Sequence, residues 1–597
     1  MNNNEISYKN NKGKECKPYE TINKIKSILK QLNISVSEYW KNPLKEFYWV
    51  HLKIDGTNLY SNGKGETEEY ALASGYGELM ERLQTFALFR FHYQFTEKEK
   101  GASGFIYAPD ERNIRLNDIL KEPKKYNSLF WKEGENYEEK LNILKGWSQI
   151  EKQQFGVDDF NEPLETDLIC TVPFINMFTR ERAYFPVKPL DLMYGSNGMC
   201  AGNTPMEAIL QGLSEIIERN VNKRIILEKI TPPDIPVEYI KANCPTSYTM
   251  IRELEKDGKY KIIVKDCSLG EGYPVVAILL IDKILNKYFV KFGAQPIMDI
   301  ALERALTELL QGRSLESSIY WMKDYSYLDE KAKTSRNIEN TLHTGDGYYP
   351  KEFFSLEYSY EFSPQIIVSE YSNESFLKKL IKLIKKSEKE IFIRDVSFLG
   401  FPSYQIIVPG FSEIYESNIE RINWHHSYYK AKISARKLGK AKQEDFDNIL
   451  NFMKLNGYTN EESVENILGL PIERKTEWWQ LKTDIFRCLV DVWKCDYINA
   501  YIHINKFVDE KKSHPGHWST VKCMRDYIGM KMEGGHSEKN ISLQLERIYD
   551  KDIVKAIMKY LANPQDVFSK YNLNCFNCDF CDVCLQKNIN KIYISLK

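Results

Sequence analysis

The spacing of hydrophobic residues changes along the chain, and it predicts a mixed α/β region followed by a helical one. Alternating or continuous apolar runs predict strands at 48–54, 168–172, 183–187, 261–264, 275–281, 288–292, 391–395 and 405–408. Apolar residues spaced three and four apart predict helices at 21–43, 374–388 and throughout 420–597. The region 225–300 is predicted to alternate short strands with one helix. The expected fold class is therefore α/β (α+β) with an all-helical C-terminal domain.

These changes of pattern divide the chain into four segments. Residues 1–50 would form an N-terminal arm and helix, 51–420 the mixed domain, 421–570 the helical domain and 571–597 a tail with four cysteines. We expect 95–165 to be a surface insertion and 325–365 to be loop, because both are irregular and rich in charge. The helical domain would contact a partner or a second copy, so a homodimer is predicted.

The strongest local signal is a helix that begins near residue 205. Thr204 suits the N-cap, Pro205 suits the first helical position, and Glu207 has the spacing of a capping box. A glycine-rich turn, 198–202, precedes it. At helical spacing the apolar face holds Ile209, Leu210, Leu213, Ile216 and Ile217, and the polar face holds Glu207, Gln211, Glu215, Glu218 and Arg219.

Two other segments repeat this arrangement. A glycine-rich segment, 61–65, is predicted to be a turn that leads into a helix ending near 82. One face of that helix holds Ser74, Glu78, Glu81 and Arg82, and one face of a helix at 300–313 holds Glu303, Arg304, Thr307, Glu308 and Gln311. Three helices with apolar backs and acidic fronts suggest one shared polar cavity.

The simplest explanation of each acidic face is exposure to solvent. However, glutamates at helical spacing repel one another, and glycine turns before helix N-termini commonly hold phosphate. Hard carboxylate oxygens suit Mg²⁺, which usually binds together with phosphate, and arginines would hold the phosphate groups. Because no G-x-x-x-x-G-K-[ST] motif occurs, the pattern favours an ATP–Mg²⁺ site without a P-loop.

Composition narrows the class of protein. With 43% hydrophobic residues and a net charge of −1, the 597-residue chain has an ordinary globular composition and no general affinity for nucleic acid. It has no run of 18 apolar residues and its polar N-terminus does not resemble a secretory signal, so neither membrane insertion nor export is expected. Scattered cysteines are typical of reduced thiols, which predicts a cytoplasmic protein.

The acidic segments together resemble the YcaO family, in particular its stand-alone members, and the resemblance covers nearly the whole chain. The motifs are Ser61-Asn-Gly-Lys-Gly, Glu78-x-x-Glu81-Arg82, Ser196-Asn-Gly-Met-Cys-Ala-Gly-Asn203, Glu207-Ala, Gln211-Gly-Leu-Ser-Glu215-x-x-Glu218-Arg219, Phe292-Gly-Ala and Leu302-Glu-Arg-Ala-Leu-Thr-Glu-Leu-Leu-Gln-Gly-Arg313. The resemblance implies a YcaO fold in which the acidic helices bind ATP.

The resemblance also implies an enzyme that uses ATP and Mg²⁺ to phosphorylate a peptide-backbone amide oxygen, after which a nucleophile attacks the carbon. The stand-alone type is associated with methylthiolation of a small-subunit ribosomal protein, as an accessory factor. The implied partners are a peptide or ribosomal-protein substrate and a methylthiotransferase or sulfur donor. The first alternative is an azoline- or thioamide-forming enzyme, although the proline-rich tail of many azoline-forming relatives is absent from this sequence. The second is a non-catalytic ATP-binding scaffold.

Two sets of positions carry over from the family. The ATP set is Lys14, Thr21, Cys200, Asn203, Glu207, Gln211, Arg219 and Arg304, and the Mg²⁺ set is Glu78, Glu81, Glu207, Glu215 and Glu218. Lys14 and Thr21 lie in the N-terminal arm, which would fold over the site unless it is a solvated tail. Cys200 stands where a related protein has a serine, so it either packs as a small apolar group or handles sulfur.

Four further cysteines form a C-x-x-C-x-x-C-x-x-C run that predicts a metal centre. They are Cys575, Cys578, Cys581 and Cys584. Structural zinc usually draws two C-x-x-C pairs separated by a longer loop, whereas consecutive spacing resembles that of an iron–sulfur cluster. The sequence therefore leaves both zinc and an iron–sulfur cluster open.

Overall fold

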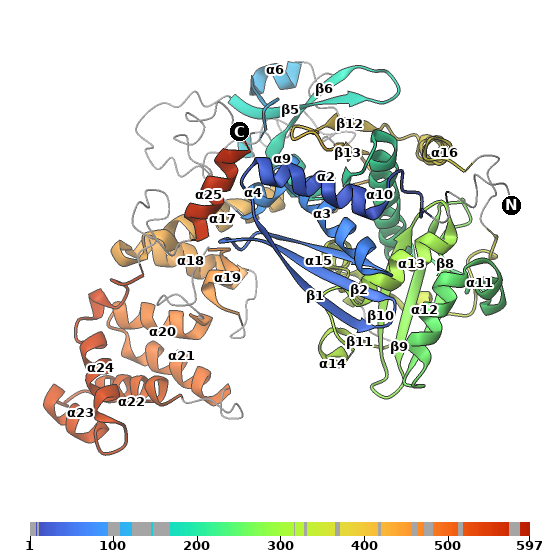
Figure 1. Ribbon diagram of the computed structural model, residues 1–597. Coiled ribbons are helices and arrows are strands. Elements are labelled where there is room, and N and C mark those ends of the chain that lie inside the picture. The colour runs from blue at the N-terminus through green and yellow to red at the C-terminus, as the bar shows by residue number, and fades with distance from the viewer. Residues whose placement is uncertain are drawn as a thin grey trace. The chain divides into compact units, whose positions relative to one another are not determined.

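Figure 1 shows a computed structural model of the chain. It describes residues 8, 11–92, 108–121, 145–146, 168–315, 317–327, 331–364, 371–415, 419–455, 462–470, 481–510, 518–571 and 585–596. The chain forms two compact units, one of residues 1–147, 165–418 and 591–597, the other of residues 148–164 and 419–590. The first unit is mixed α/β and the second is rich in helix, as the hydrophobic pattern predicted.

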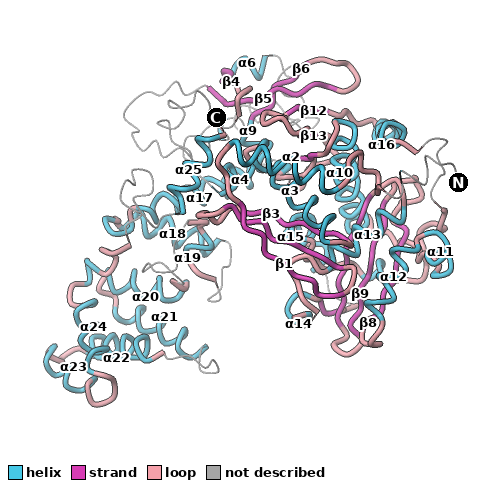
Figure 2. The backbone as a smooth tube through the Cα atoms, in the orientation of Figure 1, coloured by secondary structure: helices cyan, strands magenta, loops and turns pink. Residues whose placement is uncertain are grey.

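Antiparallel sheets form the framework of the first unit (Figure 2). One sheet has the strand order β1-β2-β3, another β11-β10-β9-β8, and a third β4-β5-β12-β13-β7 with β6 paired to β5. Their bounds are β1 Val36–Leu44, β2 Phe47–Ile54, β3 Tyr60–Gly65, β4 Arg112–Arg115, β5 Leu168–Asn176, β6 Arg182–Pro186, β7 Met199–Ala201, β8 Tyr260–Asp266, β9 Val275–Asp282, β10 Lys287–Ala294, β11 Lys323–Asp324, β12 Phe392–Asp395 and β13 Ser403–Ile407.

The first unit also contains helices, several of which pack against these sheets. They are α2 Pro18–Gln31, α3 Glu68–Gln84, α4 Ala87–His92, α6 Leu116–Lys121, α9 Val187–Tyr194, α10 Pro205–Leu227, α11 Val237–Asn243, α12 Pro245–Glu255, α13 Met298–Leu309, α14 Ser318–Trp321, α15 Ser335–Thr344 and α16 Asn373–Lys386. The α3 helix packs on β2 and β3, α10 on β7, β10 and β13, and α13 on β9 and β10. Each of the three acidic helices thus rests its back on a sheet.

The central helix, α10, starts and packs as its sequence predicts. The Thr204 hydroxyl accepts a hydrogen bond from the Glu207 backbone N–H at 3.3 Å, which caps the first turn. Leu213, Ile216 and Ile217 are fully buried in a core shared with β9 and β10. Burying side chains of this size stabilises the fold by roughly 1.5–3 kcal/mol each, so the apolar face anchors the helix and leaves its polar face for the site.

The segment 61–65 is a strand, not the predicted turn. In β3, Gly63 and Gly65 lie against α3, and a Cβ on Gly65 would come within 2.6 Å of the Ala71 nitrogen. Glycine is therefore required here for close packing between strand and helix rather than for a turn. Likewise, the predicted turn at 198–202 contains β7, which pairs with β13, after a left-handed Gly198 (φ 78°).

Three other local predictions were wrong. The helix predicted for 21–43 ends at Gln31, and the edge strand β1 begins at Val36 after Asn33 turns the chain with a φ of 56°. The region 225–300 holds two helices, α11 and α12, where one was expected. The supposed loop 325–365 contains α15, whose N-cap is Thr334 and which ends at a left-handed Gly345 (φ 75°). Its few apolar positions, such as Leu342, are too sparse to stand out as a helical period.

The regular elements described in the second unit are helices, apart from one isolated bridge between Ser463 and Lys482. They are α17 Ile419–Arg436, α18 Gln443–Leu455, α19 Val464–Ile467, α20 Thr483–Trp493, α21 Tyr497–Glu510, α22 Ser519–Glu533, α23 Glu538–Leu545 and α24 Lys551–Leu561, and the C-terminal helix is α25 Leu585–Ser595. Buried residues from α18, α20, α22 and α24 form its core. Of the helices that the structure describes, none has both the length and the apolar character needed to cross a membrane.

Candidate functional site

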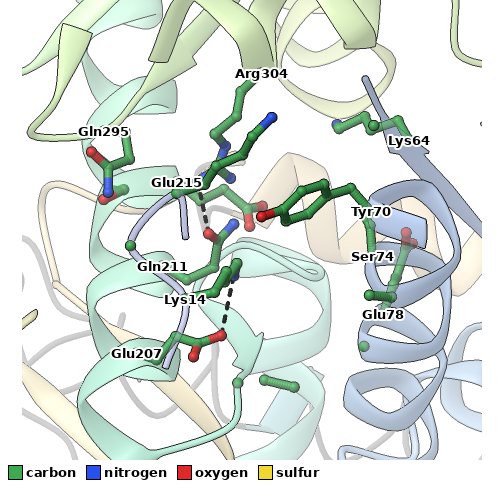
Figure 3. Close-up of a pocket in the computed structure, with 18 of the residues that line it drawn as sticks. Lys14, Lys64, Tyr70, Ser74, Glu78, Glu207, Gln211, Glu215, Gln295 and Arg304 are labelled. Carbon is green, nitrogen blue, oxygen red and sulfur yellow. Dashed lines mark hydrogen bonds and ion pairs between the residues drawn. The ribbon is translucent and has the colours of Figure 1, made fainter. Parts of the chain in front are cut away.

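A cavity of about 430 Å³ lies between α3, α10, α13 and the N-terminal arm (Figure 3). All three predicted polar faces line it. Its charged lining consists of seven glutamates and six basic residues, namely Glu78, Glu81, Glu207, Glu215, Glu218, Glu303, Glu308, Lys12, Lys14, Lys64, Arg82, Arg219 and Arg304. The volume is that of an ordinary small-ligand site.

The polar stripe of α10 forms one wall. Glu207, Gln211 and Glu215 follow one another along the helix and point into the cavity (Figure 3). Glu215 forms an ion pair with Arg219 at 2.8 Å, and Glu218 accepts a hydrogen bond from the Ala294 backbone N–H at 3.0 Å. The second guanidinium nitrogen of Arg219, Nη1, is buried and has no hydrogen-bond partner within the described part of the chain.

The α3 helix forms the facing wall, with Ser74 and Glu78 on the side that faces α10 (Figure 3). Arg82 lies 3.1 Å from Glu81 and 3.6 Å from Glu78. Gly77 also lines the cavity, and a Cβ there would meet no atom within 4 Å. This wall therefore leaves open space beside its carboxylates.

The third wall, α13, connects to α10 and to the strand β3. Nη1 of Arg304 donates to Oε1 of Gln211 on α10 at 2.7 Å. Glu308 pairs with Lys64 of β3 at 2.8 Å. Cations from other elements thus partly neutralise the carboxylates on these helical faces. Because their repulsion is reduced, the carboxylates can lie together around one cavity.

The N-terminal arm reaches this cavity. Lys14 lies 3.2 Å from Glu207, and the Glu15 backbone N–H donates to the same carboxylate at 3.0 Å. The Thr21 hydroxyl donates to the Asn203 side chain at 2.8 Å. The arm is therefore folded over the end of the cavity where α10 begins, as Figure 3 shows for Lys14.

Burial and neighbouring glutamates raise the pKa values of some cavity glutamates, and nearby cations lower that of another. Burial, with the neighbouring Glu215 and Glu78, raises the pKa of Glu81 to about 8, and burial with Glu308 and Glu215 raises that of Glu218 to about 7. Burial also acts on Glu308, but Lys64, Lys291 and Arg304 lower its pKa to about 2. Glu81 and Glu218 therefore lose their protons less readily than an exposed glutamate does.

Among the described residues, no three His, Cys, Asp or Glu side chains gather closely enough to hold a metal ion alone. Mg²⁺ usually takes only one or two carboxylates and completes its shell with phosphate oxygens and water.

Cys200 does not line the cavity. It is fully buried beneath α10, where its thiol lies against Gly212 and donates to the Tyr404 carbonyl at 3.6 Å. Burial, with Glu81 and Glu215 nearby, raises the pKa of the thiol well above its ordinary value. The structure therefore separates Cys200 from the other predicted nucleotide residues.

The four cysteines of the C-terminal run lie outside the described residues. Zinc or an iron–sulfur cluster at these positions stays a prediction.

The structure adds lining residues that the sequence did not single out. Asn62 and Lys64 lie two positions apart in β3, so both side chains point to the same face of the strand, toward the cavity. This two-residue period is the sequence signal that could have predicted a strand here. Lys12 pairs with Glu303 at 2.5 Å and also with Glu66, and it lies 4.6 Å from the centre of the Tyr70 ring. No sequence period links an arm lysine to these partners.

Comparison with known proteins identifies the family. Residues 62–412 match the YcaO cyclodehydratase family, described as ATP- and Mg²⁺-binding, and residues 428–573 match the YcaO cyclodehydratase C-terminal domain. Because the first match covers more than half of the chain, this protein belongs to the YcaO family.

Two relatives span almost the same length. The ribosomal protein S12 methylthiotransferase accessory factor YcaO of Escherichia coli (strain K12) is 29% identical over 553 residues, 91% of each chain. An uncharacterized protein of Haemophilus influenzae is 26% identical over 592 residues, 94% of this chain and 93% of that one. Among solved structures, YcaO from Methanopyrus kandleri bound with AMPPCP and Mg²⁺ aligns with a TM-score of 0.41 and 16% identity, over 67% of this chain and 92% of that one.

Proposed function

We propose that this protein uses ATP and Mg²⁺ to activate a peptide-backbone amide by phosphorylating its oxygen. The activation would assist methylthiolation of a small-subunit ribosomal protein or a related sulfur-transfer step. The observation that carries the proposal is the convergence of glutamates and arginines from α3, α10 and α13 on one cavity. The accessory role named for the Escherichia coli relative supports the choice of modification.

The residues of the cavity fit a magnesium nucleotide because it carries charges of both signs. In the structure Arg219 pairs with Glu215 and Arg82 pairs with Glu81. Phosphate oxygens would bind the arginines, including Nη1 of Arg219, which has no hydrogen-bond partner among the described residues. Mg²⁺ would bind the carboxylates that the arginines release. Both sets of side chains would then have better partners at once.

Each predicted ATP or Mg²⁺ residue except Cys200 has a place in this scheme. Glu78, Glu81, Glu215 and Glu218 would hold two or more Mg²⁺ ions between them. Arg219 and Arg304 would neutralise charge on the phosphoryl group during transfer. The remainder of the nucleotide would bind near the N-terminus of α10, where it would contact Lys14, Thr21, Asn203 and Glu207. Gln211 would keep Arg304 in position.

When bound, ATP would supply the γ-phosphoryl group that is transferred to the amide oxygen. A nucleophile would then add to the amide carbon, and the C–O bond would break so that the oxygen and its electron pair leave as inorganic phosphate. The cavity walls would orient the phosphates and exclude bulk water, since hydrolysis is the competing reaction.

Two measurements test the proposal. Purified protein should release phosphate from ATP in the presence of Mg²⁺, faster when a substrate protein is present, whereas binding without turnover would favour a scaffold. Mass spectrometry of proteins from cells with and without the gene should show an added methylthio group on a ribosomal protein. Loss of water, or exchange of oxygen for sulfur in a peptide, would instead indicate an azoline- or thioamide-forming enzyme.

A further inference from the structure

A second, smaller cavity of about 100 Å³ adjoins the first. Glu218, Arg219 and Glu308 line both cavities, so they form a shared wall. The polar stripe of α10 continues into the second cavity with Asn222, one turn beyond Glu218. β10 contributes Lys291 to its lining, and α15 contributes His343, which is exposed to solvent. The second cavity thus lies at the phosphate end of the proposed nucleotide site.

Lys291 is the most unusual residue of this cavity. Its side chain is only 8% exposed, and burial lowers the pKa of its ammonium group. Its nearest acceptor in a hydrogen bond is the Thr344 carbonyl at 3.5 Å, at the C-terminus of α15. The negative end of the α15 helix dipole lies at this carbonyl, and it favours an ammonium group there. However, an ammonium has three donors, and one long contact leaves most of that capacity unused among the described residues.

The neighbours of Lys291 also present donors. Asn222 accepts from the Tyr349 hydroxyl at 2.9 Å through Oδ1, which turns its amide nitrogen toward other partners. Nη1 of Arg219 is buried and has no hydrogen-bond partner in the described part of the chain. The carboxylate of Glu308 is held by Lys64 at 2.8 Å, and Glu218 is held at Oε2 by the Ala294 N–H. The cavity therefore offers donors from three side chains and suits a small oxyanion.

Gly345 makes room for this arrangement. It ends α15 with a φ of 75°, and a Cβ at this position would overlap Nζ of Lys291. Any other residue would be strained by the backbone and would displace the ammonium group. The lysine head therefore has a site shaped for it beside the shared wall.

We propose that the second cavity is a phosphate-release pocket, in which Lys291, Asn222 and Arg219 hold the inorganic phosphate that leaves the activated amide. This inference rests on the proposed function, because that reaction places a phosphate beside the shared wall. The phosphate departs with the former amide oxygen and with the electrons of the broken C–O bond, so it needs cationic donors at the point where it forms. The released phosphate would move from the first cavity into the second past Arg219, which lines both cavities.

The test measures binding of inorganic phosphate to the full-length protein in the presence of ADP and Mg²⁺. Lys291→Met should weaken phosphate binding by about tenfold or more, because it removes a charge-assisted hydrogen bond. Affinity for a non-hydrolysable ATP analogue with Mg²⁺ should change by less than about threefold. Lys287→Met is the matched control: Lys287 lies on the same strand, pairs with Asp324 and lines neither cavity.

Asn222→Asp provides a second variant of nearly identical shape. It keeps an acceptor for Tyr349 and should weaken phosphate binding at least as much as Lys291→Met, because it replaces a donor with a negative charge. Wild-type phosphate affinity in folded Lys291→Met and Asn222→Asp would overturn this inference and leave the proposed function intact. If the wild-type protein itself fails to bind the ATP analogue, the proposed function is overturned instead.

Discussion

Nη1 of Arg304 donates a hydrogen bond to Oε1 of Gln211 at 2.7 Å, which joins α13 to α10 across the wall of the cavity. These residues are 93 positions apart in the chain. Gln211 is uncharged, so it orients the guanidinium without forming an ion pair with it, and Arg304 remains available to a ligand. Elsewhere in the same cavity arginines pair with glutamates, as Arg219 does with Glu215.

Replacing Gln211 with leucine should therefore weaken binding of Mg²⁺–ATP although leucine removes no charge. Arg304 would lose the hydrogen bond that orients it, and we expect affinity for a non-hydrolysable analogue to fall by about tenfold, or ~1.4 kcal/mol. Calorimetric titration measures this. Gln31→Leu, at the exposed end of α2, should bind like the wild type, and equal affinity in the two variants would contradict the assigned role.

Glu215→Gln should separate ligand binding from stability. In the free protein the change relieves repulsion among neighbouring glutamates but also removes the ion pair with Arg219, so thermal stability should change little. Affinity for Mg²⁺–ATP should fall at least about tenfold, because a carboxylate that would hold Mg²⁺ is lost. The control is Glu228→Gln, at the exposed end of α10, where Glu228 pairs with Arg224. A large loss of stability without loss of affinity would assign Glu215 a structural role only.

Glu303→Gln should stabilise the free protein at high pH only. Burial, opposed by Lys12 and aided by Glu66, raises the pKa of Glu303 in the folded state to about 7, above its ordinary value of 4.5. The folded state therefore binds the proton more tightly, and the stability that this proton provides is lost as the pH rises from 4.5 to about 7.

Urea unfolding at several pH values tests this. The variant and the wild type should be equally stable near pH 4.5, and the variant should gain up to about 3 kcal/mol by pH 8. Since Glu303 pairs with Lys12, a variant less stable than the wild type at pH 8 would show that this ion pair outweighs burial.

Cys200→Ser should leave ATP turnover unchanged. The thiol is fully buried against Gly212 outside the cavity, and burial raises its pKa so that it stays protonated near neutral pH. Alkylating reagents should modify the exposed Cys495 in the native protein and leave Cys200 unmodified. Loss of turnover in a folded Cys200→Ser variant would instead indicate a role for this thiol in sulfur chemistry.

The C-terminal cysteine run should bind a metal independently of the nucleotide. Protein purified without air should contain zinc or iron with sulfide, and replacing Cys575, Cys578, Cys581 and Cys584 with serine should remove it. Affinity for Mg²⁺–ATP should not change, because the predicted Mg²⁺ ligands are glutamates in distant segments. Metal-free wild-type protein would contradict the prediction.

Much of the site could be predicted from local sequence. The helical period placed Glu207, Gln211 and Glu215 on one face and Leu213 and Ile216 on the other, and the structure keeps that division. The cap at Thr204 was equally local. Both depend on residues three or four positions apart, and helix geometry alone relates such neighbours.

The sequence by itself thus determined which side chains share a helical face, and their mutual repulsion indicated that the faces need cations. Only the tertiary structure decided which cations those are: Lys64 reaches Glu308, Lys12 reaches Glu303, and Lys291 lies behind the shared wall. It also decided that 61–65 is a strand, since Gly63 and Gly65 fit a turn or a close helix contact equally well until α3 lies against them. The physical reason is range: helix period is set within one turn, whereas ion pairs and packing depend on how distant segments meet.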